Sequence, residues 1–170
     1  ADLNKLAFWS ATGSGKTLLM HVNILQFTHY ADGKMPINRT ILITPNAGLT
    51  QQHIDEFALS NIEANIFSKQ LVGGLFDRGS VDIIEITKLA ENDGDKTVAV
   101  DSFESNNLVL IDEGHRGSSG EVWKKMRDKL STDGFAFEYS ATFGQAISSQ
   151  SNAAKKKAML NEYGRATLFD

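Results

Sequence analysis

The sequence predicts an α/β fold in which a mostly parallel sheet is covered by helices on both faces. Short apolar, β-rich runs alternate along the chain with segments of helical periodicity, which is typical of such sheets. The 170 residues are 41% hydrophobic and 22% charged, so they can bury one sizeable core. The chain has 14 glycines and only 2 prolines, which suits regular elements joined by glycine turns. Its length fits a single domain, and no internal repeat or domain boundary is visible.

The first half of the chain begins with an expected strand over Leu6–Trp9, which a glycine-rich loop follows. The next segment is predicted to be a helix, because a set of its residues recurs at helical spacing. These residues are Leu18, Val22, Leu25 and His29. Gly33 and Pro36 end this helix. The remaining elements of this half are a strand over Thr40–Thr44, a helix over Gly48–Ser60, a weak strand over Ile66–Phe67 and a glycine-rich loop over Leu71–Ser80.

The second half continues the alternation of strand and helix. Leu108–Ile111 is the most apolar run and is expected to be a buried strand. Val122, Met126 and Leu130 line one face of a predicted helix and should point inward. The basic residues of the same helix are interpreted as a solvated outer face, in preference to a DNA-facing patch: Lys124, Lys125, Arg127 and Lys129. The other expected elements are a strand over Val81–Thr87, an acidic loop over Glu91–Lys96, a strand over Phe135–Tyr139, a polar lid or linker over Ser148–Lys157 and a last strand over Tyr163–Phe169.

Composition excludes several classes of protein. With 17 Lys and Arg against 21 Asp and Glu, the formal charge is −4, so any contact with nucleic acid must come from a local patch. The absence of cysteine removes disulfide scaffolds, thiolate metal sites and cysteine nucleophiles. No apolar run approaches the about 18–20 residues that a membrane span needs. No basic-then-apolar leader opens the chain, so a cytoplasmic location is expected. His21, His29 and His53 show no metal-ligand spacing, and no zinc site is expected.

A glycine-rich loop between the first expected strand and helix has the context of a phosphate-binding loop. Its glycines let several backbone N–H groups point at one phosphate, and the helix N-terminus adds its dipole. Lys16 would sit on the β- and γ-phosphates, and Thr17 would hold Mg²⁺ through its hydroxyl. The first position of the pattern, normally glycine, is Ser10. The expected nucleotide-binding residues are Thr12, Gly13, Ser14, Gly15, Lys16 and Thr17. The alternative is an ordinary glycine turn that precedes Lys-Thr.

Two carboxylates follow the buried strand over Leu108–Ile111. Asp112 at the strand end can bind Mg²⁺ through its water shell, since Mg²⁺ is bound by few carboxylates and keeps several waters. Glu113 can orient and deprotonate an attacking water, which makes it and Lys16 the expected catalytic residues. The alternative is a solvated acidic turn after a core strand. His115 lies two residues beyond Glu113 and is interpreted as a link between the nucleotide and neighbouring elements, not as the base.

These residues give the chain a resemblance to the first RecA-like motor domain of superfamily 2 helicases and translocases. Four motifs occur in the family's order: Ser10–Thr17, Thr44–Leu49 with Gln51 and Gln52, Asp112–His115, and Ser140–Thr142. Within the superfamily, Asp112–Gly117 and Phe137–Phe143 look most similar to the ATPase subunits of type III restriction enzymes. The resemblance implies a three-layer P-loop NTPase fold. It also implies that residues 1–170 are one ATP-binding domain from a longer motor protein, because nothing here matches the second RecA-like domain or a nuclease.

The resemblance also implies functional roles. Ser140 and Thr142 would couple the state of the ATP to the grip on DNA, and the strand that ends in Ser140 would lie between the phosphate-loop strand and the acidic strand. The residues expected to face the nucleic-acid backbone are Thr44, Pro45, Asn46 and Thr87. Such phosphate contacts are independent of sequence and need no cationic side chain. The implied partners are duplex DNA, a second RecA-like domain of the same chain, and a methyltransferase or specificity subunit, with no membrane involved.

The expected activity is hydrolysis of ATP with Mg²⁺, coupled to translocation on nucleic acid or to strand separation, in a restriction or phage-defence system. Two alternatives stay open at this stage. A P-loop kinase that phosphorylates a small molecule would share the phosphate loop, but it would not require the acidic box of Asp112 or the Ser140 motif. A motor-like domain that only binds or assembles would be expected to have lost Lys16 or Glu113, and both are present.

Overall fold

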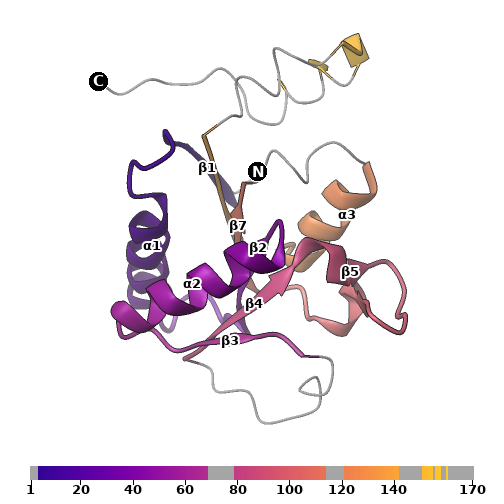
Figure 1. Cartoon of the computed structure of the whole chain (residues 1–170). Coiled ribbons are helices and arrows are strands. Elements are labelled where there is room, and N and C mark those ends of the chain that lie inside the picture. Colours follow the sequence, from indigo (N-terminus) through magenta and orange to yellow (C-terminus); the bar gives the residue numbers. More distant parts are fainter. Residues whose placement is uncertain are drawn as a thin grey trace.

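The computed structural model describes residues 4–68, 79–113, 121–141, 151–154, 156–157 and 160 (Figure 1). Several predictions concern residues outside this set: the roles of His115 and Thr142, the last strand over Tyr163–Phe169, most of the loop over Leu71–Ser80, and part of the segment over Ser148–Lys157. Among the described residues, no helix is both long and apolar enough to cross a membrane.

A parallel sheet of six strands forms the centre of the molecule. Its strands, in spatial order, are β1 (Lys5–Trp9), β8 (Phe135–Ser140), β7 (Leu108–Asp112), β2 (Thr40–Thr44), β4 (Val81–Glu85) and β3 (Ala64–Ile66). Every neighbouring pair is parallel. The strand that ends in Ser140 therefore lies between the phosphate-loop strand and the acidic strand, as the resemblance implied. The carboxyl ends of these strands meet at one edge of the sheet, where α/β proteins bind ligands.

Helices cover both faces of the sheet, which confirms the predicted α/β class. Helices α1 (Lys16–Ala31) and α2 (Ala47–Leu59) lie together on one face, and α3 (Glu121–Leu130) lies on the other (Figure 1). Two 3-10 turns, Ile86–Lys88 and Val100–Ser102, and a two-strand ladder of β5 (Leu89–Ala90) and β6 (Val98–Ala99) complete the described elements. Every residue of β7 is buried, as expected for a central strand that is covered on both sides.

Helix α1 is present where the spacing predicted it, but the residues that indicated it do not form its buried face. Leu18 is 65% exposed and Leu25 is 57% exposed, whereas Met20 and Ile24 are buried against the sheet. The packed face also contains Asn23, whose Nδ2 donates a hydrogen bond of 2.7 Å to the buried Tyr139 hydroxyl. Because α1 carries apolar side chains on most of its faces, their spacing predicted that a helix forms but not which face it buries.

The inward face predicted for α3 is only partly correct. Leu130 is buried and Met126 packs against the core, but Val122 is 52% exposed. The solvated basic face is wrong at Arg127, which is 1% exposed. Its Nη1 lies 2.9 Å from Oε1 of Glu138, a fully buried carboxylate on β8. The guanidinium turns toward the sheet because a buried carboxylate needs a charged partner.

Candidate active site

The loop after β1 has the backbone geometry of a phosphate-binding turn. Gly13 and Gly15 have φ angles of 76° and 86°, in the left-handed region that favours glycine. Gly15 is the N-cap residue of α1, and no side chain among the described residues caps this helix. The first backbone N–H groups of α1 are therefore available to a ligand at the helix N-terminus, where the helix dipole also favours an anion.

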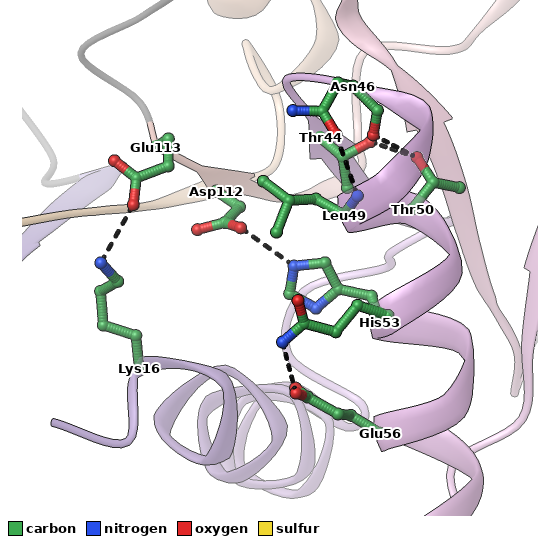
Figure 2. A network of polar contacts seen from close by, with 10 residues as sticks. Lys16, Thr44, Asn46, Leu49, Thr50, His53, Glu56, Asp112 and Glu113 are labelled. Carbon is green, nitrogen blue, oxygen red and sulfur yellow. Dashed lines mark hydrogen bonds and ion pairs between the residues drawn. The ribbon is translucent and has the colours of Figure 1, made fainter. Parts of the chain in front are cut away.

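The phosphate-loop lysine and the acidic strand end meet across this loop. Lys16 Nζ lies 3.0 Å from Oε1 of Glu113, and both side chains are mostly buried (Figure 2). Glu113 has a φ of 53°, a conformation that costs an ordinary residue about 1–2 kcal/mol. The turn places the Glu113 carboxylate opposite α1 instead of along the direction of β7. The ammonium of Lys16 and the carboxylate of Glu113 neutralise one another at this distance.

Asp112 has a different partner, which the sequence analysis did not identify. Nε2 of His53 lies 3.0 Å from Oδ2 of Asp112, and both groups are buried (Figure 2). Because an ionised carboxylate only accepts hydrogen bonds, Nε2 must be the donor. His53 lies in the middle of α2 and is separated from Asp112 by 59 positions in the sequence. No local pattern signals this contact.

One cavity of about 620 Å³ joins these groups. Its floor is the phosphate loop with Lys16 and Thr17, and the two acidic residues close one side. A further wall is made by side chains of α1 and α2: His21, Leu49, Gln52, His53, Glu56 and Leu59. The structure thus brings together most of the nucleotide, metal and catalytic residues that the sequence predicted. The wall from α2 was not predicted as part of the site.

The second histidine of this wall, His21, is buried, and it contacts an uncharged hydroxyl and an aromatic ring. Its Nδ1 is 2.7 Å from the Ser60 hydroxyl, and its ring stacks on Phe57 with centroids 4.3 Å apart. Burial lowers the pKa of His21 below its ordinary value; the nearby His53 lowers it further, and Glu56 partly opposes the shift. The imidazole of His21 is therefore held in its neutral form.

The residues present at the cavity fit a magnesium ion. Thr17 supplies a hydroxyl and Asp112 a carboxylate, and both line the same cavity as Lys16. Mg²⁺ prefers hard oxygen ligands and takes only one or two from the protein beside phosphate and water. No cluster of three or more His, Cys, Asp or Glu side chains with metal-binding geometry occurs within the described ranges. A cation here would therefore depend on Thr17, Asp112 and bound phosphate.

Of the residues expected to couple ATP to DNA or to contact nucleic acid, some are buried and others are exposed. Ser140 is buried at the end of β8, and its carbonyl accepts a hydrogen bond of 3.2 Å from the backbone N–H of Ser10 at the phosphate loop. Thr44 is fully buried and its hydroxyl lies 2.6 Å from that of Thr50, so its side chain fastens α2 instead of facing the surface. Asn46 is exposed and caps α2, since its Oδ1 accepts from Leu49 N at 3.0 Å.

The remaining two expected nucleic-acid residues, Pro45 and Thr87, lie near the carboxyl edge of the sheet. Pro45 follows β2 and is half-buried. Thr87 is exposed in the 3-10 turn that follows β4, and its hydroxyl bonds Glu85. Since β2 and β4 are parallel neighbours, Pro45 and Thr87 lie at the same carboxyl edge of the sheet.

Comparisons with known proteins agree with this architecture. A family profile described as type III restriction enzyme, res subunit, matches residues 1–145. Curated proteins gave no match. Among solved structures, the chain is similar to the SWI2/SNF2 ATPase core of Sulfolobus solfataricus in complex with dsDNA, with a TM-score of 0.60 and 14% identity. The match covers 95% of this chain but only 32% of that one, so this chain spans about a third of its structural neighbour. The chain thus belongs to the family of type III restriction enzyme res subunits and is a helicase-like ATPase domain with a P-loop fold.

Proposed function

We propose that the chain binds Mg·ATP in the cavity above the phosphate loop and forms one half of the ATP-hydrolysing site of a DNA motor. The observation that carries this proposal is the convergence of Lys16, Thr17, Asp112 and Glu113 on one cavity. Lys16 and Thr17 begin α1 after the loop that follows β1, whereas Asp112 and Glu113 lie at the end of β7, and β1 and β7 are not neighbours in the sheet. A glycine turn or an acidic turn alone would not require this convergence.

We propose a separate task for each of these residues. Lys16 would leave Glu113 and neutralise charge on the β- and γ-phosphates, while backbone N–H groups of the loop hold the phosphate oxygens. Thr17 and Asp112 would hold Mg²⁺, which, when bound, neutralises charge that develops on the phosphates. Glu113 would accept the proton of the water that attacks the γ-phosphorus, as the bond to the β–γ bridging oxygen breaks.

The exchange of partners by Lys16 links binding to chemistry. In the structure, its ammonium and the Glu113 carboxylate are 3.0 Å apart. Phosphate that binds Lys16 would weaken this ion pair, and the Glu113 carboxylate would then accept a proton more readily.

The nucleic-acid partner proposed here is duplex DNA. The carboxyl edge of β2 and β4 carries the exposed Asn46 and Thr87 side chains, with Pro45 beside them. Amide, hydroxyl and backbone groups of this kind can bind phosphates without regard to base sequence. Support also comes from the family of restriction enzyme subunits and from the structural neighbour, whose ATPase core is in complex with dsDNA. A role in restriction or phage defence, a cytoplasmic location and a methyltransferase or specificity subunit as partner are part of the same proposal.

A second RecA-like domain is proposed as the other half of the site. It would supply an arginine to the γ-phosphate, a contribution worth about a thousand- to a hundred-thousandfold in rate in related systems. Phosphate release, measured with and without duplex DNA, tests this function. These 170 residues alone should turn over ATP slowly, and a protein that also contains a second motor domain should show DNA-stimulated turnover. Fast, DNA-stimulated turnover by the isolated chain would contradict the two-domain site. If the longer protein released phosphate at the same rate with and without duplex DNA, the proposed motor function would be contradicted.

A further inference from the structure

We propose that His53 is a positioning residue that fixes the carboxylate of Asp112 for Mg²⁺; this inference rests on the proposed Mg·ATP site. His53 would act through Asp112 and would not touch the nucleotide phosphates. The contact is direct, with Nε2 of His53 at 3.0 Å from Oδ2 of Asp112. Neither the motif at Asp112 nor the motif that begins at Thr44 assigns a role to this imidazole.

The burial of the pair makes the contact specific. The side chain of His53 is 3% exposed and that of Asp112 is 9% exposed, so water competes little for either group. With Oδ2 bound by the imidazole, the other carboxylate oxygen points to the side of the site where Lys16 and Glu113 lie (Figure 2). A carboxylate held by one oxygen in this way presents the other to a cation or to its water shell.

The imidazole is itself held firmly by helix α2. Asn46 caps the helix through the backbone N–H of Leu49, and Thr50 bonds the Thr44 hydroxyl at the end of β2. His53 lies one turn further along, with its ring 6.3 Å from that of Phe57. Helix α2 therefore cannot slide along the sheet without breaking buried hydrogen bonds. Thr50 and His53 lie about one turn apart on α2, so the helix that Thr50 fixes to β2 also places the imidazole against the Asp112 carboxylate (Figure 2).

The hydrogen bonding of His53 favours a role at Asp112 over a general structural role. Its Nδ1 is buried, and within the described ranges it has no hydrogen-bond partner. Buried side-chain nitrogens are mostly paired, so an imidazole that makes a single hydrogen bond is held in place at some energetic disadvantage. That one bond goes to the expected metal ligand. A histidine that served only to fill space would be replaceable by an apolar side chain without effect on the cation.

Two polar substitutions separate positioning from packing. In His53→Gln, the amide nitrogen can reach the place of Nε2 and still donate to Asp112. In His53→Asn, the amide lies near the place of Nδ1 and is too short to reach Asp112. Both variants keep a neutral polar group in the same buried space. An exposed histidine of α1, His29→Gln, provides the matched control.

The measurement is the affinity of a fluorescent ATP analogue for the chain in Mg²⁺ and in EDTA, with thermal unfolding recorded for each variant. The ratio of the two affinities reports the cation and does not depend on turnover. We expect the ratio to fall about 10- to 100-fold in His53→Asn, as for other residues that orient a metal ligand. The ratio should remain near the wild-type value in His53→Gln and His29→Gln, and affinity in EDTA should change little in all three.

The outcomes distinguish this inference from the proposed function. An unchanged ratio in His53→Asn, beside a clear Mg²⁺ dependence in the wild-type chain, would overturn the role of His53 alone. Equal losses in Mg²⁺ and in EDTA, or equal losses in the Gln and Asn variants, would show a merely structural role and would also overturn it. A wild-type chain that binds ATP no better with Mg²⁺ than in EDTA would overturn the proposed function, and this inference with it.

Discussion

Glu113 combines an unfavourable backbone conformation with a partly buried ion pair, and both bear on how the proposed site would work. Its φ of 53° lies in the left-handed region, where a residue with a Cβ is strained. Such strain persists only where the surroundings hold it, and it is concentrated at functional sites. Here the ion pair of 3.0 Å with Lys16 is one of the interactions that hold the turn. Entry of a phosphate would exchange this interaction for a stronger one.

The first prediction concerns Glu113→Gln. Because Gln cannot hold Lys16 by charge, the lysine should be freed for phosphate, and ATP should bind up to about fivefold more tightly, the effect of a pair worth up to about 1 kcal/mol. Hydrolysis in a protein with both motor domains should fall about a hundred- to ten-thousandfold, because the general base is lost. Equilibrium titration and phosphate release measure the two effects. Weaker binding together with normal hydrolysis would contradict both roles.

A second residue-scale prediction concerns pH and His21. Burial, and then the charge of His53, lower the pKa of His21 in the folded chain, so the unfolded chain binds the proton more readily. The stability that neutral His21 contributes is present above its unfolded pKa of about 6.5 and is lost as pH falls below it. The free energy of unfolding should therefore decrease on acidification, by at most about 1.4 kcal/mol per pH unit from this group.

His21→Asn tests this assignment. Asn keeps a polar atom near the place of Nδ1 and can still reach the Ser60 hydroxyl, but it does not titrate. Urea unfolding between pH 7 and pH 5 should give a shallower loss of stability in this variant than in the wild-type chain. Identical slopes would show that another group causes the acid sensitivity.

Residues whose function depends on a local pattern could be predicted from the sequence, and residues that depend on the fold could not. The phosphate loop from Thr12 to Thr17 and the pair Asp112–Glu113 were predicted as site residues because strand, turn and charge follow each other directly, and most of these residues line one cavity. His53 and His21 enter the same cavity from two helices, and only the packing of those helices brings them there. The burial of Thr44, which was expected at the surface, could not be predicted either, because it depends on the contact with Thr50 about one turn into α2.

At the scale of elements, a buried ion pair joins α3 to the sheet. Arg127 Nη1 and Glu138 Oε1 are 2.9 Å apart, and Lys5 of β1 lies 3.6 Å from the same oxygen. Glu138 stands two residues before Ser140 on β8, opposite Ile111 of β7. The helix that comes after the acidic box is thus fastened to the strand that carries the Ser140 motif. The pair is structural and lies outside the nucleotide cavity.

Arg127→Met should therefore destabilise the chain strongly. Methionine preserves volume, but it leaves Glu138 as a buried charge whose remaining ion-pair partner, among the residues that the structure describes, is the more distant Lys5. Breaking a buried pair in this way costs about 3–5 kcal/mol, whereas replacing both partners by apolar residues is often neutral. Chemical denaturation should show a large loss for Arg127→Met and substantial recovery in Arg127→Met with Glu138→Leu. If the single variant were as stable as the wild type, the ion pair would not be a structural contact.

The positions of helices and strands were more predictable than the faces they bury. Strand β7 was clear because every residue of Leu108–Ile111 is apolar, as a doubly covered strand requires. Helix α1 gave no such signal. Leu18 and Leu25 are exposed, while polar Asn23 is buried through its bond to Tyr139. The orientation of α1 is set by that bond and by the packing of Met20 and Ile24, which spacing alone does not reveal.

At the scale of the whole molecule, the order of the strands creates the site. Strand β8 separates β1 from β7, so the phosphate loop and the acidic turn face each other across one intervening strand. Helices α1 and α2 share one face of the sheet, which turns α2 into the wall of the cavity. The alternation of elements predicted an α/β sheet, but the position of β8 between β1 and β7 followed only from the resemblance to motor domains, and the order of the other strands was not predicted. Periodicity describes each element separately and does not specify its neighbours.

The central claim, that this cavity is a Mg·ATP site, is tested most directly by the affinity of a fluorescent ATP analogue for the wild-type chain and for Lys16→Ala, with Mg²⁺ present. Lys34→Ala, at an exposed lysine in the turn that follows α1, is the control for a general loss of positive charge. Loss of a charge-assisted contact of about 1.5–3 kcal/mol should weaken binding about ten- to a hundredfold in Lys16→Ala. Lys34→Ala should bind as the wild type does. Equal affinities of the wild-type chain and Lys16→Ala would contradict the assignment of the phosphate loop, and the proposed function would fail with it.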